Sequence, residues 1–119
     1  AKNPVDLTPI WREYPRLYPP LLRTLFASEE IDMIFATVID VATTIESLMN
    51  AITEEVAQVR KEVDISKPIY IYWASPHNMR DNRQILQRAR IPCYPSTITT
   101  VRVATAICQY ALQAARERD

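Results

Sequence analysis

The sequence contains no glycine, whereas an average protein has about 7% of this residue. Phosphate-binding loops of the P-loop and dinucleotide-binding types need glycine where the backbone approaches the ligand closely. The absence of glycine therefore excludes both types of loop from this chain. Nine prolines are present, and they mark the breaks between elements where glycine is usual.

The chain also lacks an excess of either charge, because 14 Lys and Arg residues balance 14 Asp and Glu residues. A neutral chain has no broad electrostatic field with which to hold a polyanion, so nucleic acid is not an expected partner. One histidine and two cysteines are too few for a recognised metal-ligand spacing or for a disulfide scaffold.

Long hydrophobic runs are absent as well. The longest stretch without Asp, Glu, Lys or Arg covers residues 103–115, which is shorter than the roughly 20 apolar residues of a membrane-spanning helix. The first residues do not resemble a secretion signal. We therefore expect no membrane partner and a cytoplasmic location.

What is present is a chain of 119 residues that is 48% hydrophobic, which is enough for one core and a single domain over residues 1–119. Apolar periodicity predicts strands at residues 5–8, 31–39, 68–74 and 91–94. It predicts helices at residues 19–27, 41–63 and 78–90, and a fourth helix that begins near Thr97 with Ser96 as its N-cap.

Alternation of strands and helices predicts an α/β domain, because a strand followed by a helix returns to a parallel strand through a right-handed crossover. We expect the last three strands to be parallel to their neighbours and the helix at residues 41–63 to be the longest. Pro15, Pro19 and Pro20 exclude a helix from the first half of residues 14–25.

Four segments together resemble one protein family. They are Asn-Pro-Val-Asp-Leu-Thr at residues 3–8, a Lys-Pro strand at residues 66–73, Arg-Gln-Ile-Leu at residues 83–86 and an Ile-Pro strand at residues 90–96. At this spacing the chain resembles the C-terminal flavodoxin-like ligase domain of NDP-forming acyl-CoA synthetases, the group that includes succinyl-CoA ligase. The resemblance covers nearly the whole chain and implies a flavodoxin-like three-layer domain with a mostly parallel sheet.

The resemblance also implies a reaction. The family interconverts an acid, CoA and a nucleoside triphosphate with acyl-CoA, nucleoside diphosphate and phosphate through a phosphohistidine, which here would be carried elsewhere. The implied partners are the ATP-grasp and CoA-binding domains or subunits, and a homo-oligomer is an alternative. CoA, ATP or GTP, and magnesium are implied for the full enzyme but not for this domain alone, which we expect to be inactive in isolation.

The family domain begins one strand and one helix earlier than this chain, so the chain is expected to be a fragment of a larger protein. In a sheet of order 2-1-3-4-5 the missing strand is central and would lie between residues 5–8 and 31–39. We expect either that the strand at residues 5–8 moves in beside residues 31–39, or that another polypeptide segment fills the gap.

The candidate binding residues follow from the resemblance, in which helix N-termini hold the phosphate. They lie in the loops after two of the predicted strands: Asp40, Val41, Ala42, Thr43, His77 and Asn78. Related domains have glycine pairs in these loops, and the carboxylate of Asp40 would compete with a phosphate for the helix N-terminus. The alternative function is therefore a non-catalytic regulatory or protein-interaction module that kept the fold and lost its phosphate loops.

No catalytic residue is assigned. His77, the single histidine, lacks the Thr-Gly or Ala-Gly that follows the phosphorylated histidine in the family, so we interpret it as a loop residue beside a helix N-terminus. Cys93 and Cys108 fall on a predicted strand and on the apolar face of a predicted helix. We interpret both as buried free thiols rather than as a redox pair.

Overall fold

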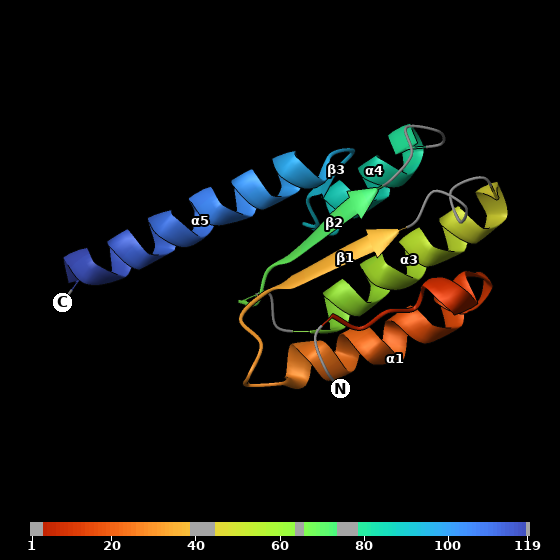
Figure 1. The fold of residues 1–119 in the computed structure, drawn as a ribbon, viewed down its shortest axis with the longest axis horizontal. Coiled ribbons are helices and arrows are strands. Elements are labelled where there is room, and N and C mark those ends of the chain that lie inside the picture. The colour runs from red at the N-terminus through yellow and green to blue at the C-terminus, as the bar shows by residue number, and fades with distance from the viewer. Residues whose placement is uncertain (1–3, 39–44, 64–65, 74–78, 119) are drawn as a thin grey trace.

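The structure is a computed structural model and describes residues 4–38, 45–63, 66–73 and 79–118. Its elements follow one another along the chain as the 3-10 helix η1 (Thr8–Glu13), α1 (Tyr14–Ala27), β1 (Ile34–Val38), α3 (Glu46–Glu62), β2 (Ile69–Trp73), α4 (Met79–Arg88), β3 (Cys93–Tyr94) and α5 (Thr97–Arg118) (Figure 1).

The three strands form one parallel sheet in the order β1-β2-β3. β1 pairs with β2 over its whole length, from Ile34 opposite Ile69 to Val38 opposite Trp73. The prediction of an α/β domain with parallel neighbouring strands is confirmed, and the arrangement is compatible with part of a flavodoxin-like fold. The strands predicted at residues 31–39, 68–74 and 91–94 are found as β1, β2 and β3, each shorter than predicted.

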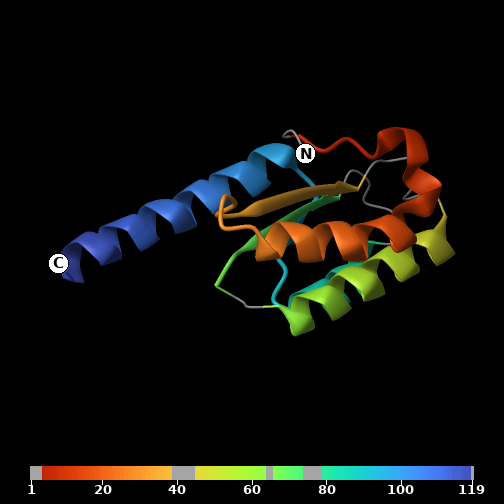
Figure 2. The same cartoon turned by 90° about the horizontal axis from the view of Figure 1, so that it is seen from below.

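Helices cover both faces of the sheet. In Figure 2, α1 and α3 lie below the sheet and α5 lies above it. α3 and α4 both contribute to the main core, because two successive right-handed crossovers in one direction place both helices on the same face. β1 shows the alternation that two different faces require: Ile34, Ala36 and Val38 are buried in that core, whereas Phe35 and Thr37 are exposed on the α5 face.

The prediction of a strand at residues 5–8 is wrong. Residues 4–7 belong to no helix or strand, and η1 begins at Thr8 with Pro9 in its first turn. Proline suits this position because its fixed φ matches a helix start and its missing N–H is not needed there. Val5 is 39% exposed, so the short apolar and polar alternation lies on no buried face.

The first α-helix starts earlier than predicted, at Tyr14. Pro15 lies in the first turn and is tolerated there, but Pro19 and Pro20 lie inside the helix, where each proline costs about 3 kcal/mol. Tertiary packing offsets this cost, because Tyr14 and Tyr18 are both buried with ring centroids 5.0 Å apart. Burial of the two tyrosines therefore extends the helix through prolines that local rules exclude.

The longest described helix is α5, which corrects the prediction that favoured residues 41–63. Residues 41–44 lie outside the described residues, and α3 has 17 residues whereas α5 has 22. At 1.5 Å per residue α5 is about 33 Å long, whereas the five residues of β2 span only about 17 Å. Neither proline nor glycine occurs within residues 97–118 to end the helix. Its second half therefore projects beyond the sheet (Figure 1).

The turn after α4 places a residue other than glycine in the left-handed region. Arg90 has a φ of 60°, and its N–H donates to the carbonyl of Gln87 at 2.9 Å. The N–H of Ile91 donates to the carbonyl of Leu86 at 2.9 Å, and both side chains are buried, which completes a Schellman cap. Glycine is usual at the Arg90 position, and a side chain there costs about 1–2 kcal/mol.

Replacing Arg90 with glycine should raise the free energy of unfolding by about 1 kcal/mol, because it removes the conflict of Cβ with the backbone at positive φ. Urea unfolding followed by circular dichroism measures the change. Arg83→Gly is the control, because Arg83 is exposed inside α4 and its replacement should lower stability by about 1 kcal/mol. Equal destabilisation by both variants would contradict strain at Arg90.

Candidate functional site

The residues predicted for the phosphate-facing loops lie outside the described residues. They are Asp40, Val41, Ala42, Thr43, His77 and Asn78. The described residues that border these loops are Val38 at the end of β1 and Trp73 at the end of β2. They mark the C-terminal edge of the parallel sheet, which is where ligands bind in open α/β folds.

Trp73 carries a buried polar group at this edge. Its side chain is 1% exposed and belongs to the main core, and Nε1 has no hydrogen-bond partner among the described residues. A buried indole N–H usually has an acceptor, so this group carries a desolvation cost. Because the ring packs within the core, we assign Trp73 to packing.

The helix N-termini near this edge already carry groups of the protein itself. Glu46 lies in the first turn of α3, where its negative charge interacts favourably with the helix dipole. At the start of α5 the hydroxyl of Ser96 accepts a hydrogen bond from the N–H of Thr99 at 3.3 Å, which confirms Ser96 as the N-cap. In the part of the chain that is described, no group of three His, Cys, Asp or Glu residues is placed to hold a metal ion.

Lys67 joins three elements at the opposite edge of the sheet, and the sequence analysis missed this role. Its ammonium group donates to the carbonyls of Leu25, Phe26 and Ser28 at 3.2, 2.9 and 2.5 Å. These carbonyls end α1, so Lys67 supplies a positive charge and hydrogen-bond donors to a helix C-terminus from 39 or more residues away. Arg60 of α3 donates in turn to the carbonyl of Lys67 at 3.0 Å.

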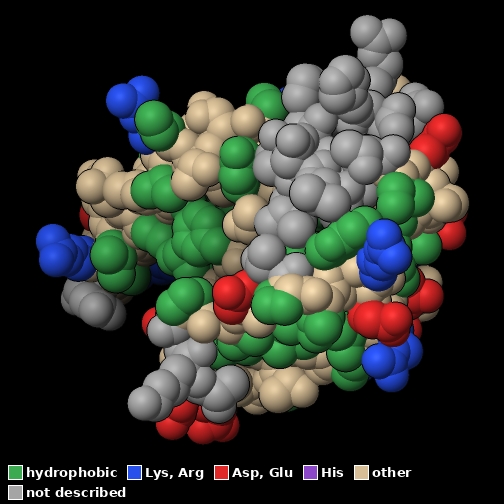
Figure 3. Space-filling view, turned by 45° about the vertical axis from the view of Figure 1, so that its right-hand side comes forward, with side chains coloured by type: hydrophobic (Ala, Val, Ile, Leu, Met, Phe, Trp, Pro, Cys, Tyr) green, Lys and Arg blue, Asp and Glu red, His purple; other side chains and the backbone are tan. Residues whose placement is uncertain are grey.

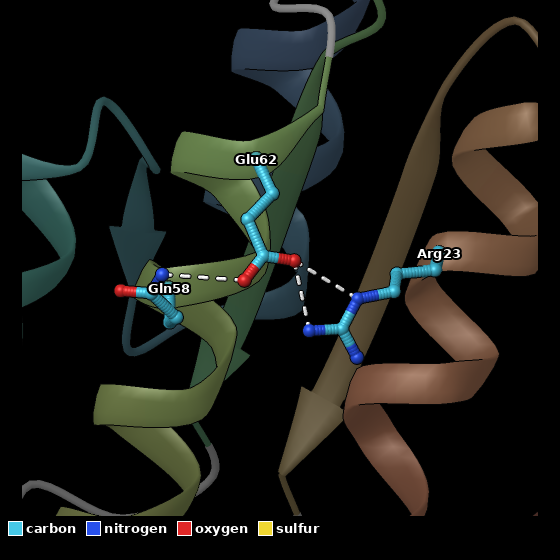
Figure 4. Close-up of polar contacts among 3 residues, drawn as sticks. All are labelled: Arg23, Gln58 and Glu62. Atoms are coloured by element: carbon cyan, nitrogen blue, oxygen red, sulfur yellow. Dashed lines mark hydrogen bonds and ion pairs between the residues drawn. The ribbon is translucent and has the colours of Figure 1, made fainter.

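A second polar contact joins α1 to α3 on the surface. Arg23 donates through Nε and a terminal guanidinium nitrogen to one oxygen of Glu62, at 3.0 and 2.8 Å, and Gln58 donates to the other oxygen at 3.2 Å (Figure 4). The Arg23 hydrogen bonds, followed by that of Gln58, lower the pKa of Glu62. Exposed pairs of this kind contribute little net stability, so Lys67 is the stronger link.

The side of β1 that faces away from β2 has no strand neighbour among the described residues. Thr37 directs its carbonyl to this side, where it accepts a hydrogen bond from the hydroxyl of Tyr18 at 2.8 Å. Burial, with a smaller contribution from Tyr14, raises the pKa of Tyr18, so the hydroxyl stays protonated and remains a donor. The edge is therefore closed at one backbone acceptor by a side chain rather than by a strand.

Two aromatic rings on the α5 face differ sharply in exposure. Phe35 and Tyr70 are paired in register on β1 and β2, and their rings stack with centroids 5.5 Å apart. Tyr70 is 1% exposed and Phe35 is 48% exposed, because α5 packs mainly on β2 and β3. None of the described helices thus packs mainly on this face of β1.

Exposed apolar side chains continue along α5. The large ones are Ile98, Val101, Ile107, Tyr110 and Leu112. Residues 103–115 contain no charged residue to solvate this part of the helix. Figure 3 shows hydrophobic side chains gathered in the left half of the view, on the side where α5 lies, with Lys and Arg side chains at the rim. The described part of α5 therefore presents an exposed apolar surface.

The two thiols lie on different elements. Cys93 is buried in β3 and Cys108 is half-buried on α5, and both are free. Burial raises the pKa of Cys93 to about 11, and nearby Arg83 opposes this shift in part. A thiol with a raised pKa is a poor nucleophile at neutral pH, which supports the interpretation of Cys93 as a core residue.

Comparison of the chain with models of protein families, with curated proteins and with solved structures finds no match. None of the described helices combines the length and the apolar character that crossing a membrane requires.

Replacing Lys67 with methionine should lower the free energy of unfolding by about 2 kcal/mol, because three carbonyls would lose a charged donor. Urea unfolding measures the loss. Lys61→Met is the matched control, because Lys61 is exposed on α3 and its replacement should change stability by less than about 0.5 kcal/mol. Similar values for the two variants would show that Lys67 does not hold α1.

The stability of the domain should fall as the pH rises from 9.0 towards 11, because the thiol of Cys93 ionises in the unfolded chain before it ionises in the fold. The contribution of Cys93 is fully present below pH 9.0 and is lost above 11, with a total of at most about 3 kcal/mol. Unfolding free energies across this range should therefore fall less steeply in Cys93→Ala than in Cys108→Ala. Parallel curves for the two variants would contradict the shift.

Proposed function

We propose that this chain is the ligase-domain portion of an NDP-forming acyl-CoA synthetase and that it supplies scaffold rather than a nucleophile. The observation that carries the proposal is the placement of the resembling segments. Residues 66–73 lead into and form β2, residues 83–86 lie in α4, and residues 90–96 form the turn into β3 and the cap of α5. Three of the four segments therefore lie in one continuous unit, β2-α4-β3, which contributes two neighbouring strands to the sheet.

The Lys-Pro segment supports the proposal further, because both residues hold the fold together. Lys67 binds the end of α1, and the carbonyl of Pro68 accepts the N–H of Ile34, which begins the pairing of β1 with β2. A scaffold domain needs such residues for its shape and not for chemistry. Their presence at the resembling positions agrees with a structural contribution to the enzyme.

In the proposed reaction an acid, CoA and a nucleoside triphosphate give acyl-CoA, nucleoside diphosphate and phosphate. ATP-grasp and CoA-binding domains of the same cytoplasmic enzyme hold the nucleotide, the magnesium and the CoA. The phosphorylated histidine also lies in another part of that enzyme. His77 takes no part in phosphate transfer in this proposal.

The test uses the protein encoded by the complete reading frame that contains these 119 residues. We expect that reading frame to encode an ATP-grasp domain and a His-Thr-Gly loop, and the purified protein to make acyl-CoA from an acid, CoA and ATP or GTP. The His77→Ala variant should retain this activity. The 119-residue chain alone should make no acyl-CoA and, after incubation with acyl phosphate, should show no added phosphate by intact mass. Absence of acyl-CoA synthesis by the complete protein, or phosphohistidine at position 77, would contradict the proposal.

The second candidate function is a non-catalytic protein-interaction module. The part of α5 at residues 103–115 favours it, because this stretch has no charged residue and exposes Ile107, Tyr110 and Leu112, whereas a solvent-exposed helix normally carries charged residues. A complete reading frame without an ATP-grasp domain, encoding a protein that makes no acyl-CoA, would favour this second function over the first.

A further inference from the structure

α5 carries a seam of small and apolar residues that begins over the sheet and continues past it. The seam consists of Thr100, Ala104, Ile107, Ala111 and Ala114, which are spaced four and three residues apart in turn. Thr100 and Ala104 are 1% and 2% exposed, and α5 packs there on β2 and β3. Ile107 and Ala111 are exposed, and Ala114 is half-buried. The seam is therefore covered over the sheet and exposed along the projecting part of α5, which we define as residues 107–118.

The spacing of the exposed seam fits a helix as its partner. Alternation of four and three residues is the a and d pattern with which two helices pack, whereas a strand has a period of two. Ala111 and Ala114 are small, so a second helix can approach to the short end of the usual range of interaxial distances. Residues 103–115 contain no charge that such a contact would bury. The projecting part of α5 thus has the chemistry of one half of a helix pair.

The sheet restricts the direction from which a helix can reach this seam. Because the seam faces the sheet at Thr100 and Ala104, its exposed part overhangs the end of the sheet at which the strands begin (Figures 1 and 2). A helix lying along the exposed part must enter from the free end of α5 and stop at the sheet. A second copy of the chain meets this condition when its α5 runs antiparallel, because each sheet then lies beyond the free end of the other helix. Parallel pairing would drive each sheet into the other helix.

The charges also suit an antiparallel pair of copies. The last turn of α5 contains Arg116 and Arg118, both exposed, and one glutamate whose carboxylate accepts a hydrogen bond from Gln113 at 3.1 Å. At the end of the sheet that α5 overhangs, the connection between α1 and β1 exposes three acidic residues, Glu29, Glu30 and Asp32. Within the described part of the chain, neither the two arginines nor these three acids form an ion pair. Antiparallel pairing brings the arginines of each copy towards the acidic residues of the other.

The exposed apolar area matches a weak dimer. Ile107, Tyr110 and Leu112 lie in the seam or beside it and are 47%, 74% and 63% exposed. With the alanines they offer at most about 500 Å² per copy, since even a large aromatic side chain contributes no more than about 250 Å². Two copies would then bury about 1,000 Å², which is the lower limit for a specific interface and typical of reversible complexes. We therefore expect a dissociation constant on the order of 50 μM.

We propose that the projecting part of α5 is a dimerisation surface, and that its occupant is the same part of α5 in a second copy of this chain, in antiparallel orientation. The two-fold axis passes between residues 112 and 113, so Ala111 of one copy packs on Ala114 of the other. The proposal goes beyond the functions proposed above, because pairing of two copies requires neither ligase activity nor a different protein.

Sedimentation velocity of the 119-residue chain between about 10 and 500 μM should show a reversible shift from monomer to dimer. Ala111→Glu should weaken the dimer at least roughly tenfold, because it places a charge in the contact. Ala106→Glu is the matched control, because it makes the same change on the exposed side of α5 away from the seam and should alter the dissociation constant less than about twofold. Circular dichroism checks that both variants keep their helices.

Disulfide trapping tests the register of the pair and does not depend on the folding of Ala111→Glu. In a Cys108→Ala background, an isotope-labelled Ala111→Cys chain is mixed with an unlabelled Ala114→Cys chain and oxidised in air. A product that joins one labelled and one unlabelled chain should dominate the intact-mass spectrum, because a disulfide needs Cα atoms within about 7 Å. The control mixes Ala106→Cys with Gln113→Cys, both exposed on the side of α5 away from the seam, and should give no such product.

Any of three results would overturn the proposal. A monomer at all concentrations up to the highest would show that a second copy does not occupy the seam. Equal dissociation constants for Ala111→Glu and Ala106→Glu would place the contact on another surface. Trapping of the Ala106→Cys and Gln113→Cys pair in preference to the seam pair would show that α5 meets its copy through the opposite side.

Discussion

The contact of Lys67 with the end of α1 is the interaction on which the rest of the fold depends. One ammonium group meets three backbone carbonyls, and the carbonyl of the same residue accepts a hydrogen bond from Arg60 of α3. The guanidinium of Arg60 also lies over the ring of Phe26, with 5.5 Å from Cζ to the ring centroid. Two helices are thereby tied to the residue that leads into the central strand. If α1 were released, the main core would lose the three buried side chains that α1 contributes to it, Tyr14, Tyr18 and Leu22.

A chain without glycine must end its helices by other means, and the structure shows several. α1 ends at Ser28 in an extended conformation, with Lys67 binding the last carbonyls. α4 ends with Arg90 at positive φ, where the buried contact of Ile91 with Leu86 stabilises a conformation that is otherwise unfavourable. α5 has neither device within residues 97–118 and runs on past the sheet. Tertiary contacts thus end helices that a local glycine cap would usually end.

The central strand β2 could be predicted from the sequence because a strand buried on both faces gives a continuous apolar run, as in residues 69–73. The prediction of a strand at residues 5–8 was wrong. These residues have the alternation of a strand but pair with no described strand, and a 3-10 helix begins at Thr8 with Pro9 in its first turn. The role of Lys67 could not be predicted, since its partners lie about 40 residues away and no local pattern marks them. The candidate loop residues at 40–43 and 77–78 stay a prediction, because they lie outside the described residues.

The projecting half of α5 determines how the molecule tumbles. The domain measures 49 × 27 × 25 Å along its principal axes, and α5 runs at a shallow angle to the longest of them (Figure 1). Rotation about that axis is faster than end-over-end rotation, and the N–H bonds of a helix lie nearly parallel to its own axis. Nitrogen spins in α5 therefore sense mainly the slow motion, whereas those in the strands, whose N–H bonds point across the sheet, sense both motions. The helix that leaves the sheet makes the rotational diffusion of the domain anisotropic and reports on it at the same time.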